Sequence, residues 1–190
     1  IKQIEKASIE GKNRYETAIQ ISKKSYPKTS ETAIIVNSEK IADSLSVGVL
    51  AHKINSPILL TDHYEINQST LKEIQRLKTT NIILVGGTQS ISLSQETNLM
   101  NQGYKVRRIY GKDRIDTSFA IATELSNLNQ TKQFDTAFVV HSTKSIVDSA
   151  SVSAAACLMD SPILFIGNDT KSFEEKYSNY TFNNTYLIGG

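Results

Sequence analysis

The sequence is poor in several features that mark common classes of protein, and each shortage excludes a class. It has a single cysteine in 190 residues, Cys157, so neither a disulfide framework nor a cysteine-based metal site is available. Cys157 lies in the apolar run SVSAAACLM, and we expect it to be a buried small apolar residue. No stretch reaches the roughly 18 to 20 consecutive apolar residues that a membrane helix needs, so no membrane span is predicted.

Signals for secretion and for cofactor binding are also missing. The first residues, IKQIEKASIEG, contain no apolar run of the secretory type, so either the protein is cytosolic or a signal has been removed. No G-x-G-x-x-G or Walker-type loop follows a predicted strand, and no metal-ligand spacing appears. With 39% hydrophobic and 21% charged residues the chain has an ordinary globular composition. We therefore expect a folded protein without a cofactor or a metal.

The net charge of the chain is small, but the charged residues are unevenly distributed along the sequence. Through Arg114 there are 17 Lys and Arg against 11 Asp and Glu, and from Ile115 onward there are 4 against 8. The basic first part can attract an anionic polymer such as nucleic acid, a teichoic-acid-like chain or a phosphorylated glycan. A solvated surface without a specific partner is the alternative. Nucleic acid is disfavoured because the tyrosines are scattered instead of interleaved with a basic stripe.

An internal repeat is the strongest signal in the sequence. Five blocks recur in the same order with offsets between 100 and 105. The matching blocks are residues 11–17 and 111–117, 33–38 and 137–142, 43–47 and 148–152, 56–60 and 161–165, and 81–87 and 184–190. We expect repeat one to occupy residues 1–107 and repeat two residues 108–190. Repeat two is expected to be incomplete at its carboxyl end, because residues 88–104 have no second counterpart.

The blocks predict alternating strands and helices. Asn13 and Asp113 are good N-caps, each followed three residues later by an acid, and a helix is predicted over residues 14–24. Residues 32–36 form an apolar, β-rich run typical of a central parallel strand. Asp43 and Asp148 are predicted to cap small-residue-rich helices over residues 44–54 and 149–159 that can approach a neighbour closely. Pro57 is expected to begin the second strand, as its counterpart Pro162 does in repeat two.

The remaining elements complete a parallel α/β unit. A helix over residues 68–78 is predicted to precede a strand over residues 81–85 that ends in Gly86-Gly87. A strand over residues 105–110 leads into the second copy. Strand, helix, strand, helix, strand predicts a parallel sheet wound right-handedly.

The ordered blocks carry a resemblance to a known family. G-x-[ND]-R-[YI]-x-T, an apolar strand, [AV]-D-S-[LA]-S, S-P-I-L-[LF] and an apolar strand ending in Gly-Gly resemble the type 2 cell-wall-binding repeat of Gram-positive, clostridial-type surface and S-layer proteins. The resemblance covers essentially the whole chain. It implies tandem Rossmann-like or flavodoxin-like repeats, usually three, that hold an extracellular surface protein non-covalently on an anionic secondary cell-wall polymer. The implied partners are that polymer and further repeats in the same or a neighbouring chain.

Candidate ligand-binding residues lie near the carboxyl ends of strands, where parallel sheets collect ligands. Arg14 and Arg114 each start a helix, where a cation is opposed by the helix dipole, so another interaction must favour them. Either they pair with Asp43 and Asp148, or they hold an anionic glycan through bidentate contacts. The remaining candidates are the strand-end residues Asn37 and His141, and the hydroxyls Ser44 and Ser149 beside the two aspartates, although N-capping alone explains those aspartates.

An α/β, hydrolase-like enzyme acting on cell-wall glycan is the competing hypothesis, because this architecture hosts many catalysts. Among the histidines only His141 follows a strand, and its counterpart in repeat one is Asn37. No Ser-His-Asp order is common to both copies. The sequence therefore favours a non-catalytic anchoring module over an enzyme.

Overall fold

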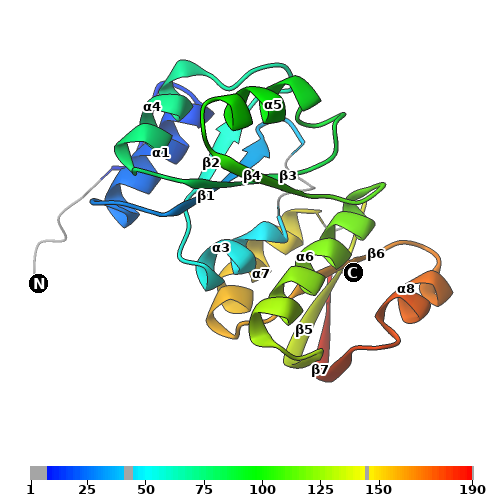
Figure 1. Ribbon diagram of the computed structural model, residues 1–190. Helices are drawn as coiled ribbons and strands as arrows, with labels where there is room; N and C mark the ends of the chain where they lie inside the picture. The colour runs from blue at the N-terminus through cyan, green and yellow to red at the C-terminus, as the bar shows by residue number, and fades with distance from the viewer. Residues whose placement is uncertain (1–7, 41–44, 144–145, 190) are drawn as a thin grey trace, which may run out of the picture.

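The computed structural model describes residues 8–40, 45–143 and 146–189, with the backbone alone for residues 146–149. This part of the chain contains two parallel sheets, one from each repeat (Figure 1). The first has the order β2-β1-β3-β4, from β1 (Thr32–Asn37), β2 (Ile58–Thr61), β3 (Asn81–Val85) and β4 (Lys105–Ile109). The second has the order β6-β5-β7, from β5 (Gln133–His141), β6 (Ile163–Ile166) and β7 (Thr181–Ile188). The predicted fold class of tandem parallel α/β repeats is confirmed.

The helices alternate with these strands. They are α1 (Arg14–Ser25), α3 (Val47–Lys53), α4 (Gln68–Arg76), α5 (Leu93–Asn101), α6 (Arg114–Asn129), α7 (Ile146–Leu158) and α8 (Thr170–Tyr177). In the parts of the chain that the structure describes, none of these helices is both long and apolar enough to span a bilayer. The predicted division between residues 107 and 108 stays a prediction; β4, which crosses it, pairs with β3 of repeat one.

The outer face of the first sheet is covered by α1, α4 and α5. An aliphatic core lies between them, containing Ile19, Ile35, Ile74, Leu84 and Leu99. A buried polar contact joins α1 and α4: the Glu73 carboxylate accepts hydrogen bonds from the Ser22 hydroxyl at 2.7 Å and from Arg76. Because the acid is 98% or more buried, these bonds compensate for its lost hydration.

The outer face of the second sheet has an aromatic core in the matching position. Phe119 on α6 lies edge-on to Tyr177 of α8, and Tyr180 and Phe182 stack on each other beside them. Burial raises the pKa of the Tyr177 hydroxyl. Phe119 replaces the smaller Ile19 of repeat one and Tyr177 replaces Ile74, so the same outer layer is filled by different side chains in the two copies.

The inner faces of the two sheets share one apolar core. Figure 1 shows α3, α6 and α7 lying between the sheets. Ile34, Val85 and Leu50 from repeat one pack in the same cluster as Ile121 and Phe165 from repeat two. Burying such side chains contributes roughly 1.5–3 kcal/mol each. The two repeats are therefore joined by packing of the kind found inside a single domain.

Helices α3 and α7 pack closely against each other where the two repeats meet. A Cβ placed on Gly48 would lie 2.9 Å from the Ser153 hydroxyl and 3.9 Å from the Cys157 sulfur. Gly48 and Ser153 occupy matching positions in the two repeats, 105 residues apart. The predicted close packing of small-residue-rich helices is thus present, and Cys157 is half-buried beside it, with a thiol pKa raised by burial.

We predict that Gly48→Leu lowers the free energy of unfolding by about 1–3 kcal/mol, because the new side chain must push α3 away from α7. Urea unfolding followed by far-ultraviolet circular dichroism measures this. His52→Leu serves as the control, since His52 is an exposed residue of the same helix. An equal effect of both substitutions would contradict the close contact.

Candidate functional site

The G-x-[ND]-R-x-x-T motif folds identically at the start of α1 and of α6. The side chain of Asn13 accepts the Glu16 N–H at 2.9 Å, and Asp113 accepts the Asp116 N–H at the same distance, so both predicted N-caps are confirmed. The threonine hydroxyl four residues after the cap accepts the N–H of the motif glycine at 3.1 Å in each copy. A Cβ on Gly11 would lie 2.5 Å from the backbone of Glu16, which explains the glycine.

The motif arginines link these helix starts to the first strand of each sheet. Arg14 Nη1 donates to the carbonyl oxygen of Ser38 at 2.8 Å, and Arg114 Nη1 donates to that of Ser142, also at 2.8 Å. No carboxylate within the described residues pairs with either guanidinium. Since a guanidinium has five N–H donors, each arginine keeps donors beyond the one it uses here.

In repeat one, hydrogen bonds connect the residues where β1 ends. Asn37, which is buried, donates to the carbonyl of Ser90 at 2.6 Å, and its side-chain oxygen accepts the N–H groups of Glu39 and Lys40. Tyr15 shares a hydrogen bond of 2.8 Å with the Ser38 hydroxyl. All these groups are satisfied within the protein, so Asn37 shapes the strand end from inside.

Lys40 is a cation at this strand end that the sequence predictions missed. It is exposed, and its ammonium donates to the carbonyl of Gln89 at 2.7 Å. The signal was present, because both repeats have a lysine three residues after the strand-end residue, Lys40 after Asn37 and Lys144 after His141. Lys144 lies outside the described residues.

Repeat two has a different strand end. The His141 ring lies 3.2 Å from the side-chain oxygen of Asn168, which follows β6, and its Nδ1 lies 3.3 Å from the Thr143 N–H. Tyr15 is replaced by Ile115 in this copy. His141 is half-buried and so is more accessible than its counterpart Asn37. The arginine contact is therefore the same in both repeats, while the side chains around it differ.

Of the predicted aspartate and serine cluster, the structure describes only the backbone of Asp148 and Ser149. Asp43 and Ser44 lie outside the described residues, and the N-cap of α3 is Ser46. The prediction that Asp148 caps a helix is wrong, because α7 already begins at Ile146 and encloses Asp148 and Ser149. The helix thus begins three residues earlier than predicted, with the apolar Ile146-Val147 before the aspartate.

The strongest electrostatic contact near the motif is in repeat two. Lys176 on α8 forms an ion pair with Asp116 in the first turn of α6. The hydrogen bond from the Lys176 ammonium lowers the pKa of the Asp116 carboxyl; partial burial opposes this and the attraction between the charges reinforces it. The ion pair fastens α8 to the start of α6.

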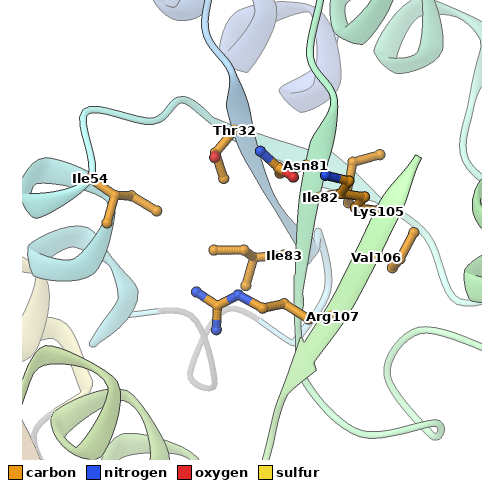
Figure 2. A pocket seen from close by; sticks show the side chains of 8 residues that line it. All are labelled: Thr32, Ile54, Asn81, Ile82, Ile83, Lys105, Val106 and Arg107. Atoms are coloured by element: carbon orange, nitrogen blue, oxygen red, sulfur yellow. The ribbon is translucent and has the colours of Figure 1, made fainter. Parts of the chain in front are cut away.

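A cavity of about 260 Å³ opens at the opposite edge of the first sheet, where the strands begin. Figure 2 shows it between the end of α3 at Ile54 and the strands β3 and β4, with Arg107 extending beneath Ile83. Its lining combines apolar side chains with Lys105 and Arg107. It is separate from the strand ends that carry Arg14 and Lys40.

Comparison with known proteins places the chain in a family. The sequence profile described as Cell wall binding domain 2 (CWB2) matches residues 8–96 and 108–190. This chain belongs to the CWB2 family. The resemblance deduced from the ordered blocks is confirmed, and each repeat corresponds to one match.

Named relatives and solved structures agree with this assignment. N-acetylmuramoyl-L-alanine amidase LytC of Bacillus subtilis is 38% identical over 112 residues, which are 59% of this chain and 22% of that protein. The amidase enhancer of the same species is 33% identical over 84% of this chain and 21% of its own length. The chain therefore spans about a fifth of each of these curated relatives.

Two solved structures from Clostridium difficile have the same fold. Cwp6 superposes with a TM-score of 0.87 at 28% identity, and Cwp8 with 0.84 at 32% identity. Each comparison covers 96% of this chain, and 28% of Cwp6 or 30% of Cwp8. The tandem arrangement of the two α/β repeats is thus present in both of these proteins.

We predict that Lys176→Met destabilises the protein at neutral pH by roughly 1 kcal/mol or less. The lowered pKa of Asp116 contributes stability above the unfolded-state pKa of about 4, and this contribution is lost as pH falls through the lower folded-state pKa. The difference between variant and parent should therefore shrink below pH 4. Urea midpoints between pH 2 and pH 8 measure it, with Lys171→Met on the exposed side of α8 as control. A difference independent of pH would contradict the ion pair.

Proposed function

We propose that this CWB2 chain is a non-catalytic module that binds an anionic secondary cell-wall polysaccharide and thereby attaches a larger surface protein outside the cell. The observation that carries the proposal is the family match over both repeats. The amidase and enhancer functions in the names of two relatives are not assigned to this chain, which spans about a fifth of each.

The placement of positive charge supports an anionic ligand. At the strand end of repeat one Arg14 and Lys40 are exposed, and within the described residues each donates a hydrogen bond to a backbone carbonyl. A carbonyl positions a cation without neutralising it, so its charge remains available to a phosphate or carboxylate. We include Arg114 and His141 of repeat two in the proposed site, together with the candidate residues Asp43, Ser44, Asp148 and Ser149 in the adjoining segments.

Retention on cell walls tests the proposal. The chain should bind purified walls, should bind poorly to walls stripped of secondary polymer, and should release as salt rises, since exposed charges are screened. Lys40→Gln should weaken binding by roughly two- to five-fold, the worth of one exposed ion pair. Lys28→Gln, an exposed lysine of the loop after α1, is the matched control. Unchanged retention on stripped walls, or equal retention on nucleic acid, would overturn the anionic-polysaccharide assignment.

We further propose that repeat one carries an open docking face for another repeat of the same kind, in the same or a neighbouring chain. Ile121 of α6 is 2% exposed because it packs in the core shared by the two repeats. Its counterpart on α1, Ile21, is 51% exposed. Ile21 borders an apolar groove of about 620 Å³ between α1 and α3, which also includes Tyr26, Ala51 and Leu60.

Repeat two exposes the complementary surface. Leu50 of α3 is fully buried against repeat two, whereas its counterpart Ala155 on α7 is exposed, and Leu158 beside it is 85% exposed. A further repeat on repeat one would cover Ile21 as α3 covers Ile121. Each isoleucine buried in this way contributes roughly 1.5–3 kcal/mol to association.

The docking face predicts self-association at high concentration, with α7 of one chain on the Ile21 groove of another. Ile21→Glu should lower the weight-average mass measured by sedimentation equilibrium across a concentration series. Leu93→Glu, at an exposed leucine of α5 away from the groove, should leave it unchanged. A parent chain that is monomeric throughout, or equal effects of the two substitutions, would contradict the docking face.

A further inference from the structure

The contact between the repeats joins different surfaces of the two copies. Repeat one contributes α3 and the edge of β4, and repeat two contributes α6 and α7. Such a head-to-tail contact is not self-complementary, so the two sides can carry different residues. The ion pairs between the two repeats therefore indicate which residues each side needs on its partner.

Among the residues that the structure describes, two ion pairs cross this contact. Lys53, at the end of α3, binds the Asp160 carboxylate at 2.6 Å, and Asn129 of α6 also donates to that carboxylate at 3.4 Å. Arg107 of β4 binds Glu124 of α6 at 2.7 Å. Figure 2 shows Arg107 leaving β4 below Ile83 on the face that α3 covers. In both pairs repeat one supplies the cation and repeat two the acid.

The matching positions in repeat one do not carry these acids. Glu124 corresponds to Lys24, 100 residues earlier on the uninterrupted helix α1, and Lys24 is exposed. Asp160 corresponds to Asn55, 105 residues earlier. The backbone supports this second match, because Asp160 and Asn55 both follow their helices in the left-handed conformation, with φ of 49° and 50°.

Replacing repeat two by a second copy of repeat one would therefore change both contacts. Arg107 would face Lys24, and Lys53 would face the uncharged Asn55. One ion pair would become a repulsion and the other would disappear. Part of the apolar contact would also be lost, because repeat one has Ser25 where the buried Leu125 packs. Charge juxtaposition of this kind discriminates between partners whose apolar surfaces are alike.

We infer that the Lys53–Asp160 and Arg107–Glu124 pairs determine the order of the repeats: the α3 and β4 side of repeat one accepts a repeat with acids at these positions and rejects another copy of itself. The partner class is a repeat of this family with acidic residues at the positions of Glu124 and Asp160. The inference concerns the contact inside the chain and does not depend on polymer binding.

Charge reversal within the full chain tests the inference. Glu124→Lys gives repeat two the residue that repeat one has, and should lower the equilibrium constant for folding in urea by more than the roughly two- to five-fold worth of one exposed pair. Arg107→Glu should do the same, and the double variant, which restores opposite charges, should recover most of the loss. Asp160→Asn added to Glu124→Lys should give the largest loss.

Salt separates the electrostatic role from a packing role. Between 50 mM and 1 M salt the contribution of this contact to stability should fall in the parent, because salt screens the attraction between Arg107 and Glu124. In Glu124→Lys it should rise, because salt screens a repulsion. Glu174→Lys on exposed α8 changes the net charge equally and is the control. Failure of the double variant to recover stability, or the same salt response in Glu124→Lys and Glu174→Lys, would overturn the inference.

Discussion

The burial of the inner face of the first sheet against helices of both repeats is the constraint on which the rest of the structure depends. This face, with Ile34 and Val85, is covered by a helix of two turns, α3, and by α6 from the other repeat. A helix as short as α3 is not stable by itself in water. Its burial between the repeats is what stabilises it, so neither copy completes its inner core without the other, as expected for stacked repeats.

The strand ends follow from this arrangement. Since the shared inner core holds the sheets together, the loops at the carboxyl ends of their strands can be polar. The motif arginines bind the start of a helix to the loop after the first strand in each repeat. A structural role and a ligand-binding role of these arginines therefore do not exclude each other. One N–H stabilises the loop, and the exposed remainder of the guanidinium of Arg14 is what the anchoring proposal uses.

Much of the fold was predictable because its signals are local. The strand over residues 81–85 was predicted to the residue, and the helix over 14–24 differs from α1 by one residue, since both have clear caps and apolar patterns. The start of α3 was predicted too early because Asp43 resembles an N-cap, and α5 and α8 were not predicted. Strong N-caps, Ser92 and Asp169, precede these two helices and were the available signals.

The candidate site was predictable in part, and its geometry was not. Repetition identified Arg14 and Arg114, but their carbonyl partners lie 24 and 28 residues away and depend on tertiary structure. The exposed Lys40 was overlooked although Lys144 repeats it. The pairing of Arg107 with Glu124 could not be deduced from the sequence, because it requires the relative position of the two sheets.

The different fillings of the two outer layers have a spectroscopic consequence. The chain has no tryptophan, and the outer core of repeat one is aliphatic, while that of repeat two encloses Tyr177 among Phe119, Tyr180 and Phe182. A tyrosine ring fixed among other rings has a near-ultraviolet dichroism that vanishes when the packing loosens. The near-ultraviolet signal of these rings should therefore report on repeat two, while the far-ultraviolet signal reports on both. The chain thus contains its own probe of whether its two copies unfold together.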